Sequence, residues 1–340
     1  MFPNSPSSAA AGNVLQPLLV TMSSVQSVAR ETGRSLTAVL HEIESRCAWS
    51  EVAAAMDDHL SRLAATECWG KENPLPSSVF WKEAGDTLQR GSLQAHARFK
   101  PHGYAGDFEM LDRLVRQDVR GEGLEQAFDR YFQHHPAPRA VRNRTQWVAD
   151  KLLEVVATTA GDQPVRVVSV GSGPAADIHL ALQTMDRRER SRLRVCLLDL
   201  DANGLEFARR RLTDPAHGGL DEQQLELRRE NLFRLPRRDD DPSLRAELIV
   251  CTGLFDYLPD ADAEQLLRWL ERHRAPGGTL VMMNFSPDNG SRAYMEWAGM
   301  WYLIHRTEAE MRALAQRADF GTRWELTAEP SGIDLILTRV

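Results

Sequence analysis

A glycine-rich turn, Gly171-Ser172-Gly173, follows a run of mostly β-branched residues at Val165–Val170. The run is typical of a buried strand, and a helix-like segment follows the turn. Glycine lets the backbone bend sharply and lets a ligand approach where a Cβ would otherwise stand. The first amides of the following helix then face that ligand. The turn therefore predicts a binding site for a nucleotide-like cofactor.

Acidic side chains follow the second predicted strand, in the sequence LLDLD that ends at Asp201. Asp199 lies 26 residues after Gly173, near the position from which a carboxylate binds the hydroxyls of a ribose. We therefore interpret Asp199 and the neighbouring Leu200 as cofactor-binding residues. Asp201 suits either a ligand contact or the N-cap of the next helix, and the sequence does not decide between the two.

Two polar loops, after the third and fourth predicted strands, extend this pattern. One begins with Asn231 and Leu232, where a side chain and a backbone amide can contact an adenine edge. The other follows the fourth strand, and ligands of open α/β sheets bind beyond the carboxyl ends of the strands. In that loop Thr252 and Phe255 are expected at the cofactor, whereas Asp256 and Tyr257 either act on the ligand or support the loop.

This order of motifs resembles the class I S-adenosylmethionine (SAM)-dependent methyltransferases over roughly residues 148–340. VGSGPA resembles their glycine motif, LLDLD their ribose-binding motif and ENLFRLP their adenine-side motif. The resemblance implies SAM as methyl donor or as sole substrate, with no metal. Two positions depart from the family pattern: Ser169 stands where an acidic residue often contacts the SAM amino group, and Ala175 replaces the third glycine.

A second cluster lies in the N-terminal region, at Lys100–Asp107 (KPHGYAGD). Gly103 and Gly106 flank Tyr104, so a tight exposed loop can present Tyr104 and Asp107 to a ligand. Asp107 suits equally the N-cap of the helix that follows. The segment resembles a bacterial methyltransferase-fold subgroup with a helical cap, and the architecture is similar to that of enzymes that cyclise SAM to azetidine-2-carboxylate.

Arg142, Asn143 and Arg144 lie just before the cofactor-binding region, where a cap would meet the ligand. Arginine binds carboxylates through two parallel hydrogen bonds, so Arg142 is the expected partner of the SAM carboxylate. A solvated helix face is at least as good an interpretation of Arg144. Asn143 is a candidate for the polar part of the active site.

An aromatic segment follows the fifth predicted strand, which ends at Asn284. Tyr294, Trp297 and Trp301 share one face of a helix expected over Ser291–His305. Such a stripe either packs in the core or forms an aromatic wall that holds a sulfonium cation or covers an apolar substrate. His305 is a nearby candidate base. The catalytic candidates of the whole chain are Tyr104, Asn143, Asn284, Tyr294 and Trp301.

Two kinds of segment must position these residues. From about residue 15 to residue 148, apolar residues recur at three- and four-residue spacing, which is typical of helices. From Val165 onward, strand-like and helical runs alternate, as in a parallel sheet with crossover helices. The last two strands are joined only by Glu329–Ile333, so short a link that they must form an antiparallel hairpin.

We therefore predict an α/β fold, with a Rossmann-like, seven-stranded, mostly parallel sheet, an antiparallel C-terminal hairpin strand and an all-α N-terminal cap. The expected divisions are a disordered tail at 1–13, a helical cap at 14–147 and a SAM-binding catalytic domain at 148–340.

Composition narrows the expected partners. The 340 residues carry a net charge of -7, which argues against a nucleic-acid partner. No apolar run approaches the ~20 residues of a membrane helix, and the N-terminus lacks the features of a signal peptide. The four cysteines are widely spaced, as expected of reduced thiols in a cytoplasm without a zinc site. We expect a cytoplasmic protein that acts on a small molecule, and a homodimer stays open.

Three functions are compatible with these residues. The first is methyl transfer from SAM to an oxygen or nitrogen acceptor, in secondary metabolism or signalling. The second is cyclisation, in which the SAM amine attacks its own γ-carbon and releases methylthioadenosine with azetidine-2-carboxylate. The third is a non-catalytic SAM-binding protein. Catalysis by either route depends on alignment of a nucleophile and exclusion of water.

Overall fold

Seven strands form one sheet in the order β3-β2-β1-β4-β5-β7-β6, in a computed structural model that describes residues 21–46, 48–321 and 323–339. The first five strands are parallel, and β7 runs antiparallel to both β5 and β6, as the short link before it predicted. The predicted α/β fold with an antiparallel hairpin is confirmed. The strands are β1 (Val165–Val170), β2 (Leu193–Asp199), β3 (Leu225–Arg229), β4 (Ala246–Cys251), β5 (Arg274–Phe285), β6 (Trp324–Ala328) and β7 (Asp334–Arg339).

Both faces of the sheet are buried, which explains why the central strands are almost continuously apolar. In β1, Val167 belongs to one hydrophobic core and Val168 to the core on the opposite face, because successive side chains of a strand alternate. On the Val167 side lie helices α7 (Pro136–Thr158), α8 (Ala176–Thr184) and α10 (Ala202–Leu212), and on the other side α11 (Asp260–His273) and α12 (Glu308–Arg317). The short α9 (Arg187–Arg192) precedes β2.

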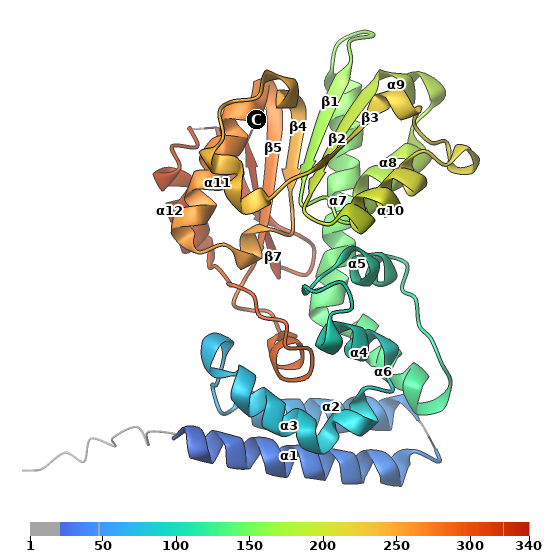
Figure 1. Ribbon diagram of the computed structural model, residues 1–340, viewed down its shortest axis with the longest axis vertical. Coiled ribbons are helices and arrows are strands. Elements are labelled where there is room, and N and C mark those ends of the chain that lie inside the picture. The colour runs from blue at the N-terminus through green and yellow to red at the C-terminus, as the bar shows by residue number, and fades with distance from the viewer. Residues whose placement is uncertain (1–20, 47, 322, 340) are drawn as a thin grey trace, which may run out of the picture.

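Before β1, the described residues form helices and connecting turns, with no strand. Figure 1 shows this helical cap below the sheet. A close approach of α1 to α3 depends on Gly33, where a Cβ would lie 2.8 Å from the Phe80 carbonyl oxygen. The cap helices are α1 (Met22–Ile43), α2 (Trp49–Ala64), α3 (Pro74–Leu88), α4 (Ser92–Phe99), α5 (Phe108–Val115) and α6 (Gly123–His134).

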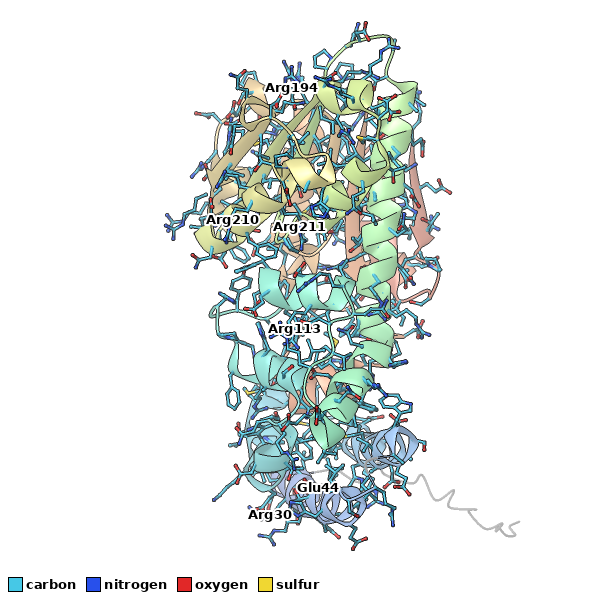
Figure 2. All side chains as sticks on the ribbon, turned by 90° about the vertical axis from the view of Figure 1, so that its right-hand side faces the viewer. Arg30, Glu44, Arg113, Arg194, Arg210 and Arg211 are labelled. Atoms are coloured by element: carbon cyan, nitrogen blue, oxygen red, sulfur yellow. The ribbon has the colours of Figure 1, made fainter. Side chains whose placement is uncertain are left out.

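Helix α7 belongs to both parts of the molecule. Its first turns, including Ala140 and Val141, pack in the cap core, whereas Val148 and Val156 pack under the sheet. At 1.5 Å per residue its 23 residues span about 35 Å. Figure 2 shows this helix running from the sheet into the cap. The division predicted between residues 147 and 148 falls inside this helix, and the tail predicted at 1–13 lies outside the described residues.

The aromatic segment after β5 differs from the predicted helix over Ser291–His305. The structure contains only a π-helical turn at Tyr294–Ala298, followed by irregular backbone to the start of α12. Met300 has a φ of 47°, in the left-handed region, and the Trp301 amide donates back to the Met295 carbonyl oxygen at 2.8 Å. This reversal ends the helix and turns Trp301 toward the sheet.

Candidate functional site

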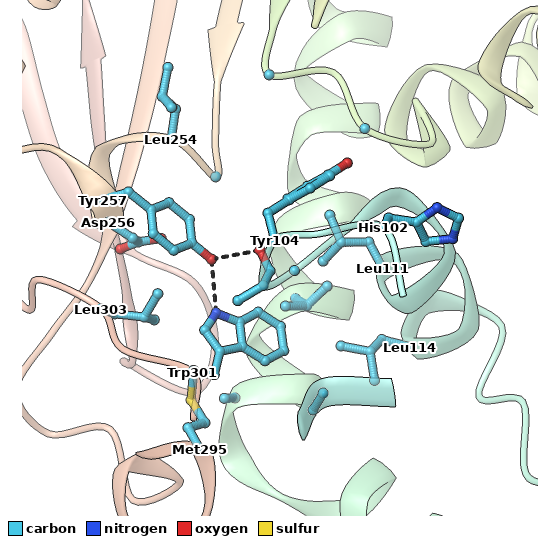
Figure 3. Close-up of a pocket in the computed structure, with 18 of the residues that line it drawn as sticks. His102, Tyr104, Leu111, Leu114, Leu254, Asp256, Tyr257, Met295, Trp301 and Leu303 are labelled. Atoms are coloured by element: carbon cyan, nitrogen blue, oxygen red, sulfur yellow. Dashed lines mark hydrogen bonds between the residues drawn. The ribbon is translucent and has the colours of Figure 1, made fainter. Parts of the chain in front are cut away.

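A cavity of about 580 Å³ lies between the carboxyl ends of the strands and the cap. The loops after β1, β2, β3 and β4 form its sheet side. The loop at 100–107, helices α4, α5 and α6, the first turns of α7 and the segment after β5 form the rest (Figure 3). Its volume is within the ~300–1,000 Å³ of typical small-molecule sites, and its position beyond the strand ends is the usual one in open α/β sheets.

The glycine turn forms part of the cavity wall. Gly171 has a φ of 67° and Gly173 a φ of 48°, both in the left-handed region, and the Gly171 amide donates to the Leu198 carbonyl oxygen at 2.8 Å. Ala175, at the position of the third glycine, takes a φ of 48° as well. The Ser172 side chain does not line the cavity, and its hydroxyl is buried without a partner.

Asp199 joins the glycine turn to the end of β2. Its carboxylate accepts hydrogen bonds from the Gly173 amide at 2.8 Å and from the Asp201 amide at 3.0 Å. Burial raises the pKa of Asp199, and these amides oppose the rise. Asp199 is therefore a buried carboxylate held in place by the turn it faces, and it lines the cavity.

Asp201 is the N-cap of α10 and also lies at the cavity. Its side chain accepts from the Asn203 amide at 2.8 Å, which caps α10, and it also lines the cavity. The Tyr104 hydroxyl donates to Asp201 at 3.0 Å, so the loop at 100–107 is tied to the sheet at this point. Asp107 has the predicted capping role at α5, where it accepts from the Met110 amide at 2.9 Å.

Apolar side chains form the far wall beyond Asp199. Leu200 and Phe233 are both more than half exposed, and they line the cavity together with Leu232. Asn231 does not reach the cavity, because its side chain accepts from the Phe233 amide at 3.2 Å and caps the turn at Leu232–Arg237. The loop after β3 therefore presents the apolar side chains of Leu232 and Phe233 to the cavity, and not the polar side chain of Asn231.

Arg142 and Arg144 of α7 have exchanged their expected positions. Arg142 is outside the cavity, since its guanidinium donates to the side-chain oxygen of Gln133 at 2.9 Å and to the Gln133 carbonyl oxygen at 2.8 Å. Arg144 is buried and not solvated, lines the cavity and pairs with Asp334 at 3.1 Å. Ala140 and Val148, four residues before and after Arg144, are buried. Apolar residues at this spacing share a helix face with Arg144, so the sequence could have indicated that Arg144 is buried.

Asp256 is a buried carboxylate beside Arg144. It lines the cavity and accepts a hydrogen bond from the Phe285 amide at 2.8 Å. Burial raises its pKa to about 6, against the attraction of Arg144. Nη1 of Arg144 donates to Asp334, and a Cβ at Gly253 would lie 3.4 Å from Nη2 of the same guanidinium. A cation and an anion thus face the same part of the cavity.

Tyr257 links three segments across the cavity. Its hydroxyl donates to the Ala105 carbonyl oxygen at 3.2 Å and accepts from the Trp301 indole nitrogen at 2.8 Å (Figure 3). A Cβ at Gly106 would lie 2.8 Å from the Trp301 ring, so glycine is needed for this close packing. These contacts place Tyr104, Tyr257 and Trp301 around one space.

The remaining aromatic candidates divide between cavity and core. Tyr294 lines the cavity and donates to the Gln94 side-chain oxygen at 2.5 Å, whereas Trp297 is fully buried in the core. Asn284 is buried and donates to the Ile304 carbonyl oxygen at 2.9 Å. Asn143 donates to Glu329 at 2.6 Å. Neither asparagine lines the cavity.

The structure therefore gathers eight of the predicted site residues around the cavity. These are Tyr104, Gly171, Gly173, Asp199, Leu200, Leu232, Tyr294 and Trp301. Seven lie elsewhere: Arg142, Asn143, Ser172, Asn231, Thr252, Phe255 and Asn284. His305 is also outside it. Cavity residues that sequence reasoning missed come mostly from the cap and the segment after β5, and include Phe132, His135, Met295 and Leu303.

The described residues contain neither a cluster of metal-ligating side chains nor a membrane-spanning helix. No group of three or more histidine, cysteine, aspartate or glutamate side chains is arranged to hold a metal ion. No described helix is both long and apolar enough to cross a membrane.

Comparisons with known proteins identify the fold. No protein-family model and no curated protein matches the chain. A solved structure of a possible exported protein from Bordetella parapertussis is 18% identical with a TM-score of 0.53, and the match covers 92% of this chain and 95% of that one. The CurJ carbon methyltransferase is 12% identical with a TM-score of 0.50, over 92% of this chain and 90% of that one. Such similarity shows a methyltransferase-like α/β fold.

Proposed function

We propose that this protein binds SAM and transfers its methyl group to a small-molecule acceptor. The observation that carries the proposal is the continuous cavity, which has the glycine turn and acidic residues at one end and an aromatic cap at the other. One structural neighbour, the CurJ carbon methyltransferase, agrees with this function. SAM would bind at the sheet end of the cavity, beside the glycine turn, and the acceptor would bind at the cap end, among the aromatic residues.

The residues at the sheet end fit the parts of SAM. The ribose would meet Asp199, and the adenine would lie against Leu200, Leu232 and Phe233. Gly171 and Gly173 leave room for the methionyl chain, because neither carries a Cβ. The apolar side chains of Leu200, Leu232 and Phe233 would thus contact the flat adenine ring, and the Asp199 carboxylate would contact the polar ribose.

Arg144 and Asp256 carry the charges that are needed to bind the carboxylate and the ammonium group of SAM. The guanidinium would bind the SAM carboxylate, and Asp256 would accept from the ammonium. Ser169, at the position where the family often has an acidic residue, lies buried within β1. A carboxylate from the loop after the neighbouring strand β4 supplies the missing negative charge in this proposal.

When bound, SAM would supply a methyl group on a sulfonium sulfur; its transfer to an acceptor lone pair would leave S-adenosylhomocysteine, and the methylated acceptor would lose any proton to bulk solvent. The protein positions the acceptor and keeps water out. The faces of Tyr257 and Trp301 can stabilise a cation near the junction of the two ends. Tyr104 covers the ribose side through its bond to Asp201.

Cyclisation of SAM is less well supported by the cavity. Of the catalytic candidates that could surround a folded methionyl chain, Tyr104, Tyr294 and Trp301 line the cavity, whereas Asn143 donates to Glu329 and lies outside it. The cavity also continues past Trp301 to Tyr294 and Phe132, which leaves space for a second molecule. We therefore place methyl transfer first.

One experiment separates the three functions. The purified protein is incubated with SAM alone and then with SAM and a panel of acceptors, and the products are resolved by mass spectrometry. S-adenosylhomocysteine that forms only with an acceptor supports methyl transfer. Methylthioadenosine and azetidine-2-carboxylate from SAM alone, above the spontaneous background, would replace it with cyclisation. Binding without turnover across the panel would favour the non-catalytic protein.

A further inference from the structure

The charged residues that line the cavity gather at its sheet end. Among the described residues these are Arg144, Asp199, Asp201, Arg229 and Asp256. The cap end is formed by Phe132, His135, Tyr294, Met295, Trp301 and Leu303. No lysine, arginine, aspartate or glutamate of the described chain lines that cap end. A charged group bound there would lose its water without gaining an opposite charge.

Polar atoms at the cap end are already paired within the protein. The Tyr294 hydroxyl donates to Gln94 at 2.5 Å, and the Gln94 amide donates to the Leu88 carbonyl oxygen. The Trp301 indole donates to Tyr257 at 2.8 Å. The Ser291 hydroxyl oxygen accepts from the Ala137 amide at 2.8 Å and lies 3.3 Å from Nδ1 of His135. These bonds leave little hydrogen-bonding capacity for a polar ligand.

His135 is uncharged at neutral pH and retains some polar capacity. Its ring packs 4.8 Å from the Tyr294 ring and 4.5 Å from the Tyr131 ring, measured between centroids. Burial lowers its pKa to about 4, although Asp57 opposes the shift. Its Nε2 is buried without a hydrogen-bond partner. His102, which also lines the cavity, faces Glu109 at 3.1 Å and belongs to the loop at 100–107.

We propose that the cap end binds an uncharged, ring-bearing, largely apolar acceptor with at most one hydrogen-bonding group near His135. The aromatic walls favour a ring, because Phe132, Tyr294 and Trp301 can pack edge or face against it. The absence of charged lining residues disfavours free carboxylates, phosphates and protonated amines. This inference concerns the acceptor site and rests on the proposed function.

The test compares three naphthalenes of similar size: neutral 2-naphthol, anionic 6-hydroxy-2-naphthoate and cationic 1-(aminomethyl)naphthalene. Calorimetry at neutral pH measures each affinity with and without saturating S-adenosylhomocysteine. We expect 2-naphthol to bind about tenfold or more tightly than either ion, which follows from the cost of an unpaired buried charge. Binding of an ion as tight as that of 2-naphthol, or no binding by any of the three, would overturn the inference.

A charge placed at the cap end provides the matched variant. Met295→Lys should shift the preference toward 6-hydroxy-2-naphthoate by about tenfold, since the new ammonium pairs with its carboxylate. Met295→Leu keeps the size without the charge and should leave the preference unchanged. Leu303→Lys repeats the test if Met295→Lys does not fold. A preference that stays unchanged in a folded lysine variant would contradict the assignment of this surface.

The control for the proposed function is S-adenosylhomocysteine binding by the wild type and each variant. Normal binding shows that the sheet end is intact, so a changed naphthalene preference then reports on the cap end alone. Failure of the wild type to bind S-adenosylhomocysteine would remove the proposed function. The preference among the three naphthalenes in the free protein would still confirm or overturn the neutral cap end.

Discussion

Arg142 and Arg144 lie two residues apart on one helix and have opposite surroundings. A rotation of about 200° between them, at 100° per residue, points one at α6 and the other at the cavity. Arg142 is satisfied by Gln133, whereas Arg144 shares a buried space with Asp256 and Asp334. In the proposed function, Arg144 and Asp256 match the two charges of the amino-acid group of SAM.

Replacement of Arg144 should lower the affinity for ligands that carry an amino-acid group and leave the affinity for ligands without one unchanged. Arg144→Lys keeps the charge but loses the bidentate geometry, and we expect the affinity for S-adenosylhomocysteine to fall about tenfold. Methylthioadenosine has no carboxylate, so its affinity should not change. Calorimetry measures both ligands. Arg142→Gln is the matched control, and an equal loss in that variant would show that Arg144 has no special role.

The affinity for S-adenosylhomocysteine should depend on pH through Asp256. Because burial raises the pKa of this carboxyl to about 6, it loses its charge as the pH falls below 6, and the ammonium then loses its partner. We expect weaker binding at pH 5 than at pH 7.5, a flatter profile for Asp256→Asn, and no such profile for methylthioadenosine. An Asp256→Asn profile identical to that of the wild type would contradict this assignment.

The raised pKa of Asp256 also predicts how this residue changes the free energy of unfolding with pH. Between its ordinary pKa of 3.8 and about 6, the folded protein keeps a proton that the unfolded chain has lost. The contribution of this group to the free energy of unfolding therefore falls as the pH rises through that window. Chemical denaturation of the wild type and of Asp256→Asn across pH 4–7 measures the difference, and an opposite slope would disprove it.

Asp199→Ala should weaken both cofactor binding and the glycine turn. The substitution leaves the amides of Gly173 and Asp201 without their acceptor, at a cost of about 2 kcal/mol. We expect a folded protein of lower stability that binds S-adenosylhomocysteine at least about tenfold more weakly. Denaturation and calorimetry measure the two effects. Unchanged affinity in the folded variant would rule out the ribose contact.

The loop at 100–107 shows how an element far from the sheet in sequence completes the site. His96 holds one end of the loop by pairing with Asp107 at 2.8 Å, and Tyr257 holds Ala105. Gly103 and Gly106 both have left-handed φ values, of 88° and 70°. Only the second of these glycines packs against the Trp301 ring.

This difference between the two glycines gives a matched pair of variants. Gly106→Ala strains the backbone and places a methyl group against Trp301, whereas Gly103→Ala strains the backbone with no atom within 4 Å of the added Cβ. We expect Gly106→Ala to reduce 2-naphthol affinity about fivefold and Gly103→Ala to leave it nearly unchanged. Similar losses in both variants would attribute the effect to loop strain alone.

Elements could be predicted where their pattern is local. The strand predicted at Val165–Val170 and the predicted end of the fifth strand at Asn284 agree with β1 and β5 to within one residue, because buried parallel strands form short apolar runs between turns. The short link Glu329–Ile333 determined the hairpin. The segment after β5 could not be predicted in the same way. Its aromatic residues have helical spacing, but the left-handed Met300 and tertiary packing of Trp301 ended the helix.

Site residues could be predicted where the topology alone places them. Gly171, Gly173 and Asp199 follow parallel strands, so any sheet of this order brings them to one edge. Ala140 and Val148 indicate that Arg144 lies on a buried face of α7, but its partner Asp334 is 190 residues later, so no local pattern predicts their ion pair. The cap end depends on packing between separate helices, so Phe132 and His135 were missed.

At the scale of the whole molecule, α7 makes the cap and the sheet one structure. Arg211 of α10 pairs with Asp112 of α5, and Phe207 packs 5.3 Å from Phe108, so a second contact joins the two parts beside the helix (Figure 2). We expect a single cooperative unfolding transition, with circular dichroism and tryptophan fluorescence coincident in denaturant. Two separate transitions would contradict a shared core.

The uninterrupted α7 also has a kinetic consequence. Because this helix is continuous, hinge opening at the junction would require breaking backbone hydrogen bonds in mid-helix. Movement of the loop at 100–107, where the Tyr104 hydroxyl donates to Asp201, would leave this helix intact. We therefore expect the residence time of S-adenosylhomocysteine to be set by this hydrogen bond, and Tyr104→Phe to shorten it in stopped-flow measurements. A dissociation rate unaffected by Tyr104→Phe would place the exit route elsewhere.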